Sequence, residues 1–523
     1  MQKNVILQVE PREAEDAASL KNALAQSLSI PPSALTGYQI LKSSLDARGK
    51  NIFRRLELRT FINEPPLHRT LLPVHYKDVR NASRKVIIIG AGPAGLFAAL
   101  QLLEAGIQPV LFERGKEVQA RRRDLAILNK KGIVDPDSNY CFGEGGAGTY
   151  SDGKLYTRST KRGSVQKILE LFYRFGAPES ILYESHPHIG TNKLPQIITA
   201  LRHQLLDAGA AIHFESRVSR ILVKNDQVEG VALASGDIIH ADAVILATGH
   251  SARDIFQSLA QDQIEIESKP FALGVRVEHP QSLIDRIQYH CDSRGPYLPA
   301  AAYSLVQQVN GRGVFSFCMC PGGIIAAAAT APGELVVNGW SPSKRNNPFA
   351  NSGIVASVGP SDYLNEKSGN DPLAAMHFQQ AVEQKAFAMG GGHLTAPAQR
   401  LTDFIQKRTS TTLPACSYVP GVRSVALHNV LPPFIFSSLA EAFKAFGKKM
   451  KGYLTEEAIA VATESRTSSP VKVPRDKETL EHIRVKGLYP CGEGAGYAGG
   501  IVSAAMDGER VARAIALKWK LSF

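Results

Sequence analysis

The chain has 523 residues, of which 44% are hydrophobic and 21% charged, an ordinary composition for a folded protein of two to four domains. No run of 18 or more apolar residues occurs, which excludes a membrane-spanning helix, and the first apolar run is too short for a secretory signal. Six cysteines spread along the chain do not resemble a disulfide framework, so we expect a cytoplasmic protein.

The formal net charge is +12, with short basic clusters at residues 121–123 and 448–451. RNA or another polyanion would suit this charge. However, neither cluster alternates with aromatic residues as nucleic-acid-binding surfaces do. We therefore interpret the charge as a solvated basic surface, with a few residues near cofactor phosphates, and expect no nucleic-acid partner. The sequence does not indicate an oligomeric state.

Residues 1–80 predict a small N-terminal α+β domain. The predicted order is a strand, a helix and two further strands, at Val5–Val9, Ala14–Leu28, Gly37–Ser43 and Ile52–Phe61. The segment from Pro65 to Lys85 is typical of a linker, because it begins with two consecutive prolines.

The rest of the chain predicts an α/β nucleotide-binding domain interrupted by a second domain. A strand–turn–helix–strand pattern at Lys85–Glu113 is followed by a helix–strand stretch at Leu194–Gly249. Short strands and one helix then alternate before the last 70 residues return to a turn and a helix. We assign residues 81–267 and 456–523 to a Rossmann-like domain, and residues 268–455 to an inserted mixed α+β substrate domain.

The first nucleotide motif is the apolar strand Val86–Ile89 opening into G-x-G-x-x-G. Gly90 permits a tight turn, Gly92 lets the backbone approach a pyrophosphate, and Gly95 lets the helix pack on the strand. The helix N-terminus offers free N–H groups to phosphate oxygens. A second strand ends at Glu113, whose carboxylate can accept both ribose hydroxyls. The contacts expected from this segment are Gly90, Gly92, Ala94, Gly95, Glu113 and Arg114.

Three further segments favour FAD over NAD. Asp242–Gly249 resembles the second nucleotide-contact motif of glutathione-reductase-type flavoproteins, and Gly487–Ile501 resembles their ribityl-contacting segment. Those proteins commonly have Asp where Glu493 stands here. Phe214–Val218 is a strand at the position that usually lies beside the adenine. The helix that begins near residue 500 would stabilise negative charge on a reduced flavin. The contacts expected here are Val218, Ala247, Thr248, Gly249, Gly492, Glu493, Gly500 and Ile501.

Three unusual motifs, at Asn139–Leu155, Phe315–Gly323 and Glu464–Pro470, make the resemblance more specific. With the C-terminal motif they are similar to a largely uncharacterised bacterial family called FAD-utilising dehydrogenases, over nearly the whole chain. The resemblance implies an FAD domain of glutathione-reductase type with an inserted substrate domain, and it implies no particular reaction. It also implies an arginine, Arg121, near the FAD phosphates, and Gly145 and Gly146 on the loop that passes the flavin.

Cys318 and Cys320 form a C-x-C pair with three interpretations. They are buried structural cysteines, or a thiol facing the substrate, or metal ligands. A bridge between them within one strand would close a strained ring. No Cys/His cluster completes a zinc set by spacing, so we expect no metal.

Other candidate groups remain open. His250, His186 and His188 could each be a general acid or an ordinary hydrogen-bonded side chain. Arg466–Ser468 could line the flavin, bind an anion or form an ordinary loop. The sequence identifies no catalytic residue beyond the flavin.

We predict an FAD-dependent oxidoreductase, a dehydrogenase or reductase, that acts on a small organic substrate by hydride transfer at the flavin. No second G-x-G-x-x-G follows a strand, so NAD(P)H would dock transiently over the flavin, or electrons would come from the substrate or another donor. A monooxygenase stays within this class. The alternatives are an RNA-modifying flavoprotein and a non-catalytic FAD-binding protein that uses residues 1–80 for interaction.

Overall fold

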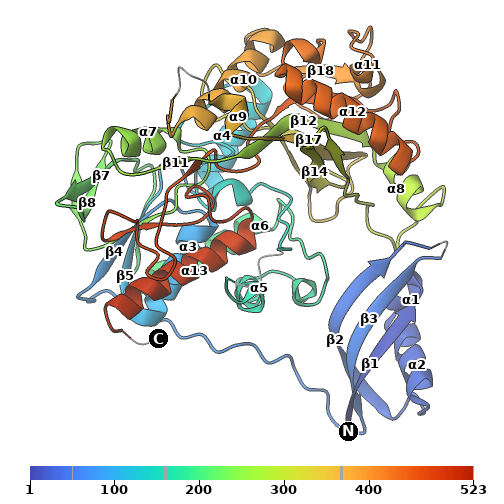
Figure 1. The fold of residues 1–523 in the computed structure, drawn as a ribbon. Coiled ribbons are helices and arrows are strands. Elements are labelled where there is room, and N and C mark those ends of the chain that lie inside the picture. Colours follow the sequence, from blue (N-terminus) through green and yellow to red (C-terminus); the bar gives the residue numbers. More distant parts are fainter. Residues whose placement is uncertain (50, 158–161, 365–368, 522–523) are drawn as a thin grey trace.

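A computed structural model describes residues 1–49, 51–157, 162–364 and 369–521. Figure 1 shows a small N-terminal sheet set beside a larger body that holds the remaining sheets. A long connecting segment runs from this sheet back to the body. Within the described residues, no helix is long and apolar enough to cross a membrane.

The N-terminal sheet is antiparallel, with strand order β1-β3-β2. Helix α2 begins after Asp16, whose side chain accepts a hydrogen bond from the Ser19 N–H at 2.7 Å. Its Leu20 and Leu24 are buried against Leu56 and Leu58 of the sheet. The strand–helix–strand–strand order predicted for this segment is confirmed. The elements are β1 (Gln2–Val9), α1 (Pro11–Glu15), α2 (Ala17–Leu28), β2 (Leu35–Asp46) and β3 (Phe53–Ile62).

A five-stranded parallel sheet with order β22-β10-β4-β5-β6 forms the nucleotide-type part of the body. Side chains of a strand alternate between faces, so β4 supplies both cores: Val86 and Ile88 face one, Ile87 and Ile89 the other. The strands are β4 (Lys85–Ile89), β5 (Gln108–Phe112), β6 (Ala211–His213), β10 (Val244–Leu246) and β22 (Leu488–Pro490).

Helices cover the Val86 face of this sheet, and α13 packs along α3 (Figure 1). The other face carries α7 and a three-stranded antiparallel sheet, β7-β8-β9. These elements are α3 (Pro93–Ala105), α4 (Val118–Lys131), η1 (Gly146–Gly148), α5 (Val165–Arg174), η2 (Glu179–Leu182), α6 (Leu194–Asp207), β7 (Val218–Lys224), β8 (Gln227–Leu233), β9 (Ile238–His240), α7 (Arg253–Gln261) and α13 (Ile501–Lys518).

A seven-stranded sheet, order β13-β14-β17-β12-β20-β18-β19, forms the second part of the body. Its pairs are antiparallel except β18 with β19. Its strands are β12 (Phe271–Pro280), β13 (Val306–Val309), β14 (Arg312–Cys320), β17 (Phe349–Val358), β18 (Ala396–Arg400), β19 (Val422–Ser424) and β20 (Ile459–Glu464).

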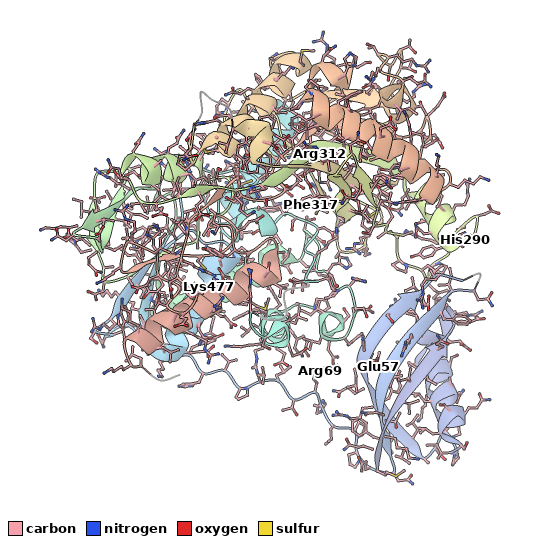
Figure 2. All side chains as sticks on the ribbon, viewed as in Figure 1. Glu57, Arg69, His290, Arg312, Phe317 and Lys477 are labelled. Carbon is pink, nitrogen blue, oxygen red and sulfur yellow. The ribbon has the colours of Figure 1, made fainter. Side chains whose placement is uncertain are left out.

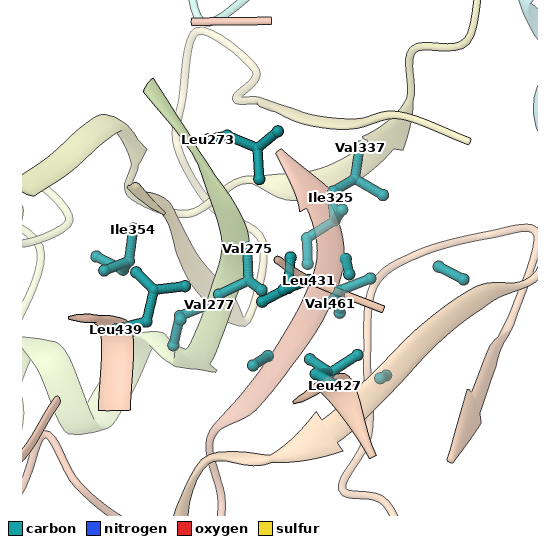
Figure 3. Close-up of a cluster of buried hydrophobic side chains, with 14 of the residues drawn as sticks. Leu273, Val275, Val277, Ile325, Val337, Ile354, Leu427, Leu431, Leu439 and Val461 are labelled. Carbon is teal, nitrogen blue, oxygen red and sulfur yellow. The ribbon is translucent and has the colours of Figure 1, made fainter. Parts of the chain in front are cut away.

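The core of this second part contains side chains from β12, β17 and β20 together with leucines from α12 and the turn before it (Figure 3). Val275, Ile354, Val461 and Leu439 are completely buried. The accompanying elements are β11 (Glu267–Ser268), α8 (Gln281–Tyr289), β15 (Ile324–Ala327), β16 (Val337–Trp340), α9 (Pro360–Tyr363), α10 (Ala374–Gly390), α11 (Leu401–Ile405), η3 (Leu427–Asn429), α12 (Pro433–Lys449) and β21 (Val471–Lys472).

The boundary predicted at residue 455 is wrong in one respect. Strand β20 lies beyond it, yet β20 pairs with β12 and β18 in the middle of the seven-stranded sheet. All six residues of β20 are buried, so both of its faces are covered, and β12 and β18 pair with its two edges. This placement depends on the packing of the whole sheet, which the local sequence does not reveal. The chain returns to the parallel sheet only with β22.

Candidate cofactor-binding site

A cavity lies between the parallel sheet and the seven-stranded sheet, with about 1380 Å³ of space between atoms, part of which is open to solvent. It begins at the carboxyl ends of β4, β5 and β10, where open α/β sheets bind their ligands. The N-terminal turns of α3 and α13 and the loop around residues 140–151 form its walls. Residues of β14, in the seven-stranded sheet, and of β16, in a separate two-stranded sheet with β15, line it from the second part of the body.

The glycine-rich turns that are far apart in sequence meet at this cavity, as predicted. A Cβ on Gly90 would stand 2.5 Å from the Ala247 carbonyl oxygen, and one on Gly494 would stand 2.4 Å from that of Gly249. Only glycine permits such close backbone contact. The predicted residues that line the cavity are Gly90, Gly92, Ala94, Glu113, Arg114, Gly146, Val218, Ala247, Thr248, Gly249, Glu493, Gly500 and Ile501.

Glu113 organises the first turn. Its buried carboxylate accepts hydrogen bonds from the backbone N–H groups of Ala91, Gly115 and Gly143, each at 2.9 Å. It therefore holds the glycine turn, its own strand end and the 140–151 loop together. The side chain also lines the cavity, so its oxygens can accept bonds from a ligand hydroxyl.

Two helices point their N-termini at the cavity. The N-cap of α3 is Gly92 and that of α13 is Gly500, and both residues line the cavity. A Cβ on Gly508 would stand 2.0 Å from the Ala94 carbonyl oxygen, so glycine at this position lets α13 lie directly on α3. Unpaired N–H groups and helix dipoles at these ends favour a negatively charged ligand.

Glu493 is the carboxylate of the third turn. Burial raises its pKa to about 8, although Lys269 nearby acts in the opposite direction. It lines the cavity beside the start of α13. Protonated, it can donate a hydrogen bond to a ligand, and ionised it can accept one.

Arg114 lines the cavity and is held from behind. Its guanidinium pairs with Asp137 at 2.7 Å and Asp254 at 2.9 Å, and lies 4.2 Å from the ring centroid of Phe142. These contacts hold the side chain in place in the lining of the cavity.

Arg121 does not reach the cavity, which contradicts its expected place near phosphates. It is completely buried, and its guanidinium donates to the carbonyl oxygens of Asn139, Tyr140 and Glu144 at 2.7–2.9 Å. These bonds hold the 139–144 loop. A loop with inward-pointing carbonyls needs such a donor, and this need is not visible in the sequence.

Three predicted glycines stand behind the cavity lining. Gly95 packs against the turn, because a Cβ there would meet the Gly90 carbonyl oxygen at 2.0 Å. The Gly145 N–H donates to the Ala91 carbonyl oxygen at 2.8 Å. The Gly492 N–H donates to Asp507 at 2.8 Å, and that aspartate is held by Arg475. These glycines shape the site and are absent from the lining.

The three candidate histidines differ in whether they line the cavity. His250 lines the cavity, but burial, reinforced by Arg466, lowers its pKa to about 4, so it is neutral at neutral pH. His188 bonds the Ser343 carbonyl oxygen at 3.2 Å, and His186 packs its ring edge on Tyr156. Neither of these two lines the cavity.

Arg466 lines the cavity from a buried network. It pairs with Glu334 at 3.0 Å and Glu383 at 2.9 Å, and Arg253 pairs with the same two glutamates at 2.7 and 2.8 Å. Its guanidinium also donates to Ser251 at 3.1 Å, on the turn after β10. The network ties the second sheet to the parallel sheet at the edge of the cavity.

Several lining residues were missed from the sequence. They come from the 140–151 loop, from β14 and from β16, none of which carries a known nucleotide-binding motif. Only the unusual Asn139–Leu155 motif and the C-x-C pair gave a signal. The missed residues include Cys141, Phe142, Ala147, Gly148, Ser151, Phe317 and Asn338.

Comparison with known proteins identifies FAD-type families over most of the chain. Residues 83–132 match the FAD binding domain family, and residues 187–329 match FAD dependent oxidoreductase. Residues 270–467 match the family described as FAD-dependent protein, C-terminal domain-like. Residues 1–61 match a domain of unknown function.

Whole-chain and partial relatives were also found. An uncharacterised protein of Clostridium beijerinckii is 38% identical over 527 residues, covering 97% of both chains. The thiamine thiazole synthase of Aeropyrum pernix is 27% identical over 36% of this chain and 64% of its own length.

Among solved structures, glycine oxidase from Bacillus cereus covers 83% of this chain and 96% of its own, at 15% identity and a TM-score of 0.29. CtdE in complex with FAD covers 83% of this chain and 84% of its own, at 12% identity and a TM-score of 0.31. On its family matches and its full-length relative, the chain belongs to the FAD-dependent oxidoreductase family, and its cofactor is FAD.

Proposed function

We propose that this protein is a dehydrogenase or reductase that oxidises or reduces a small organic molecule by hydride transfer at FAD. One observation carries the proposal: a single cavity joins three nucleotide-type turns and continues to side chains of a second sheet. The glycine-rich turns would bind FAD, and the side chains from the second part of the body would contact a substrate. FAD itself supplies the hydride chemistry when bound.

The lining residues fit an extended dinucleotide. Glu113 would accept the ribose hydroxyls of the adenosine, next to Val218, while the N-terminus of α3 at Gly92 would receive the pyrophosphate. Glu493 would contact the ribityl chain. Gly146 and the start of α13 at Gly500 would lie against the flavin ring. These positions follow the glutathione-reductase-type arrangement.

The seven-stranded sheet would supply the substrate side. Phe317 reaches the cavity from this sheet, Asn338 reaches it from the neighbouring strand β16, and Thr467 follows β20, the last strand of the sheet along the chain. Figure 2 shows Phe317 where the two halves of the body meet. We place the substrate domain at residues 268–467. It ends later than residue 455, the end expected from the sequence, because β20 belongs to the sheet. NAD(P)H would dock transiently as the electron donor.

The chain's own residues would also control protons. His250 is neutral at neutral pH, so we do not assign it as a cationic acid. Glu493, with a pKa of about 8, would be protonated in part and could donate to the cofactor's polar edge. The six cysteines are unpaired, which suits the reducing cytoplasm that we propose as the setting.

The test is cofactor retention followed by reduction. Purified protein is expected to carry FAD, shown by visible absorbance and by chromatography of the released cofactor. Under anaerobic conditions a panel of small organic substrates, NADH and NADPH is then screened for flavin bleaching. Glu113→Ala should lose FAD, while Glu57→Ala, in the separate N-terminal sheet (Figure 2), should keep it. A colourless wild-type protein that takes up no FAD would refute the proposal.

A further inference from the structure

The C-x-C pair lies at the cavity, at an irregular end of β14. Cys318 lines the cavity and Cys320 is completely buried just behind it. Phe317 pairs with Gly353 of β17 and Cys320 with Asn351, so two residues of β14 stand opposite one residue of β17. Cys318 has a φ of +46°, which a non-glycine residue rarely adopts. Such strained backbone is concentrated at functional sites.

The irregular backbone brings the Cys320 side chain against the backbone of Cys318. The Cys320 Sγ donates to the Cys318 carbonyl oxygen at 3.3 Å. In a regular strand the two side chains would stand apart along one face. The bulge changes this arrangement, which weakens the argument that a disulfide between them would be too strained to form.

Two cations hold this segment. Arg276, completely buried, donates from Nη2 to the Cys318 carbonyl oxygen at 2.5 Å and lies 3.7 Å from the Cys320 Sγ. Lys154 donates to the Met319 carbonyl oxygen. A positively charged environment stabilises a thiolate, which is the reactive form of cysteine.

Other charged groups complete the surroundings. Glu464 pairs with Arg276 at 2.6 Å, and Asp152 lies 3.5 Å from Lys154 and 2.7 Å from Arg345. Further titratable neighbours are Tyr140 and Cys141, from the 140–151 loop, and Tyr303. The carboxylates are therefore each paired with a cation.

The two thiols differ in acidity. The hydrogen bond from Cys320, with Lys154 and Arg276 close by, holds the pKa of Cys318 well below its usual range. The contact with Cys318, together with burial, raises the pKa of Cys320. Cys318, at the cavity surface, is therefore the more acidic thiol of the pair, and Cys320, behind it, the less acidic one. In thiol–disulfide exchange one cysteine commonly attacks as the thiolate while its partner carries the proton, and this pair shows the same difference in acidity.

We propose that Cys318 and Cys320 form a second redox centre of this enzyme, a dithiol that exchanges two electrons with FAD. The proposal rests on the proposed function. In the oxidation step the Cys318 thiolate and the Cys320 thiol form an S–S bond and together lose two electrons and one proton. Both electrons and the proton pass to FAD as the oxidant, so that atoms and charge balance. The small ring of a C-x-C bridge is strained, and strained disulfides are readily reduced again.

The experiment counts electrons and thiols on the same sample. FAD-containing enzyme is oxidised with ferricyanide, freed of reagent and titrated anaerobically with dithionite. It is then quenched with N-ethylmaleimide for peptide mass spectrometry. We expect four electrons per FAD, and labels on Cys318 and Cys320 only after reduction. Uptake of two electrons, with both cysteines labelled before and after reduction, would overturn the proposal.

Variants separate a redox role from a packing role. Cys318→Ser and Cys320→Ser should each take up two electrons per FAD, with the remaining thiol labelled throughout. Cys291→Ser removes a partly buried thiol that belongs to neither site and should still take up four. Four electrons in Cys318→Ser would contradict the proposal.

A further measurement does not need the cofactor. The protein is equilibrated in mixtures of reduced and oxidised dithiothreitol and then labelled with N-ethylmaleimide. Cys318 and Cys320 should lose their labels together, with the mass of an internal bridge, while independent labelling would contradict the pair. If no FAD is recovered but the bridge forms, the proposed function fails, and with it the electron exchange with FAD, while the reversible bridge between the two cysteines is still shown. If FAD cycles without a bridge, only the dithiol fails.

Discussion

At the scale of single residues, this site depends on side chains that serve backbone groups. Glu113 accepts three backbone N–H groups, and Arg121 donates to three backbone carbonyls. A buried polar backbone group without a partner costs about 1–3 kcal/mol, so each of these side chains stabilises a loop around the cavity. The loops would therefore hold their shape before a ligand binds.

Replacing Glu113 tests this point. Glu113→Ala should leave buried N–H groups unpaired and lower the affinity for FAD at least tenfold, about 1.4 kcal/mol. Glu113→Gln keeps one acceptor oxygen and should lose less. The measurement is fluorescence titration of FAD into cofactor-free protein. Equal affinity in wild-type protein and Glu113→Ala would show that the ribose is held elsewhere.

Glu493 predicts a pH dependence of stability. Burial raises its pKa from 4.5 to about 8, so between these values the folded protein binds a proton that the unfolded chain has lost. The contribution of Glu493 to the free energy of unfolding should therefore be largest below a pH of 4.5. It should fall as the pH rises from 4.5 to about 8. Glu493→Gln should remove that fall. Urea unfolding of cofactor-free protein at several pH values measures it, and Glu57→Gln serves as the control.

At the scale of elements, the contact between α3 and α13 positions both helix N-termini. Gly508 of α13 lies against the Ala94 carbonyl of α3, and Gly95 lies against the turn that precedes α3. Small residues at a helix crossing let two backbones approach closely. The two dipoles can then act on one ligand only while this spacing is kept.

Gly508→Ala should separate the two helices. A Cβ at that position would stand 2.0 Å from the Ala94 carbonyl oxygen. Overpacking of this kind costs about 1–3 kcal/mol, and the shift should also weaken FAD binding. Thermal unfolding and FAD content report both effects. Gly359→Ala, where nothing lies within 4 Å of the added carbon, should change neither. A fully stable, FAD-containing Gly508→Ala protein would contradict this interpretation.

At the scale of the whole molecule, the N-terminal sheet stands apart from the cavity (Figure 1). It meets the body through polar contacts, Ser43 with Tyr183 and Ser185 and Arg54 with Glu184 at 3.2 Å. Three apolar side chains near the end of β2 and the start of β3 also pack on the core of the second part, namely Leu45, Ala47 and Ile52. Its apolar core is separate from the others. Of the residues that the structure describes, those lining the cavity begin at Ile89.

A chain that begins at residue 64 should therefore keep its FAD. The linker side chains Val74 and Val79 pack on the body and are retained in it. The test compares FAD per chain, after gel filtration, between the shortened and full proteins. A shortened protein that folds but releases FAD would show that the N-terminal sheet acts on the site through the body.

Much of the site could be predicted because its motifs are local. Gly90, Gly92 and Glu113 lie within one strand–turn–helix–strand unit, and its spacing determines where the helix and the carboxylate stand. Arg121 was expected near the phosphates because the flavoproteins that this chain resembles often have an arginine there, and that expectation was wrong. The structure directs it to backbone carbonyls instead. The ordinary sequence of β20 gives no sign that it completes a sheet with β12, nearly two hundred residues earlier.

The sequence by itself determined the order of the elements, the glycine turns and the FAD-type cofactor, because each depends on residues close together in the chain. Only the tertiary structure decided which turns share a cavity, which side chains of the second sheet reach it, and that Cys318 is exposed to it while Cys320 is not. These outcomes depend on contacts between distant segments. Such contacts are set by packing of whole sheets against each other, which no local pattern records.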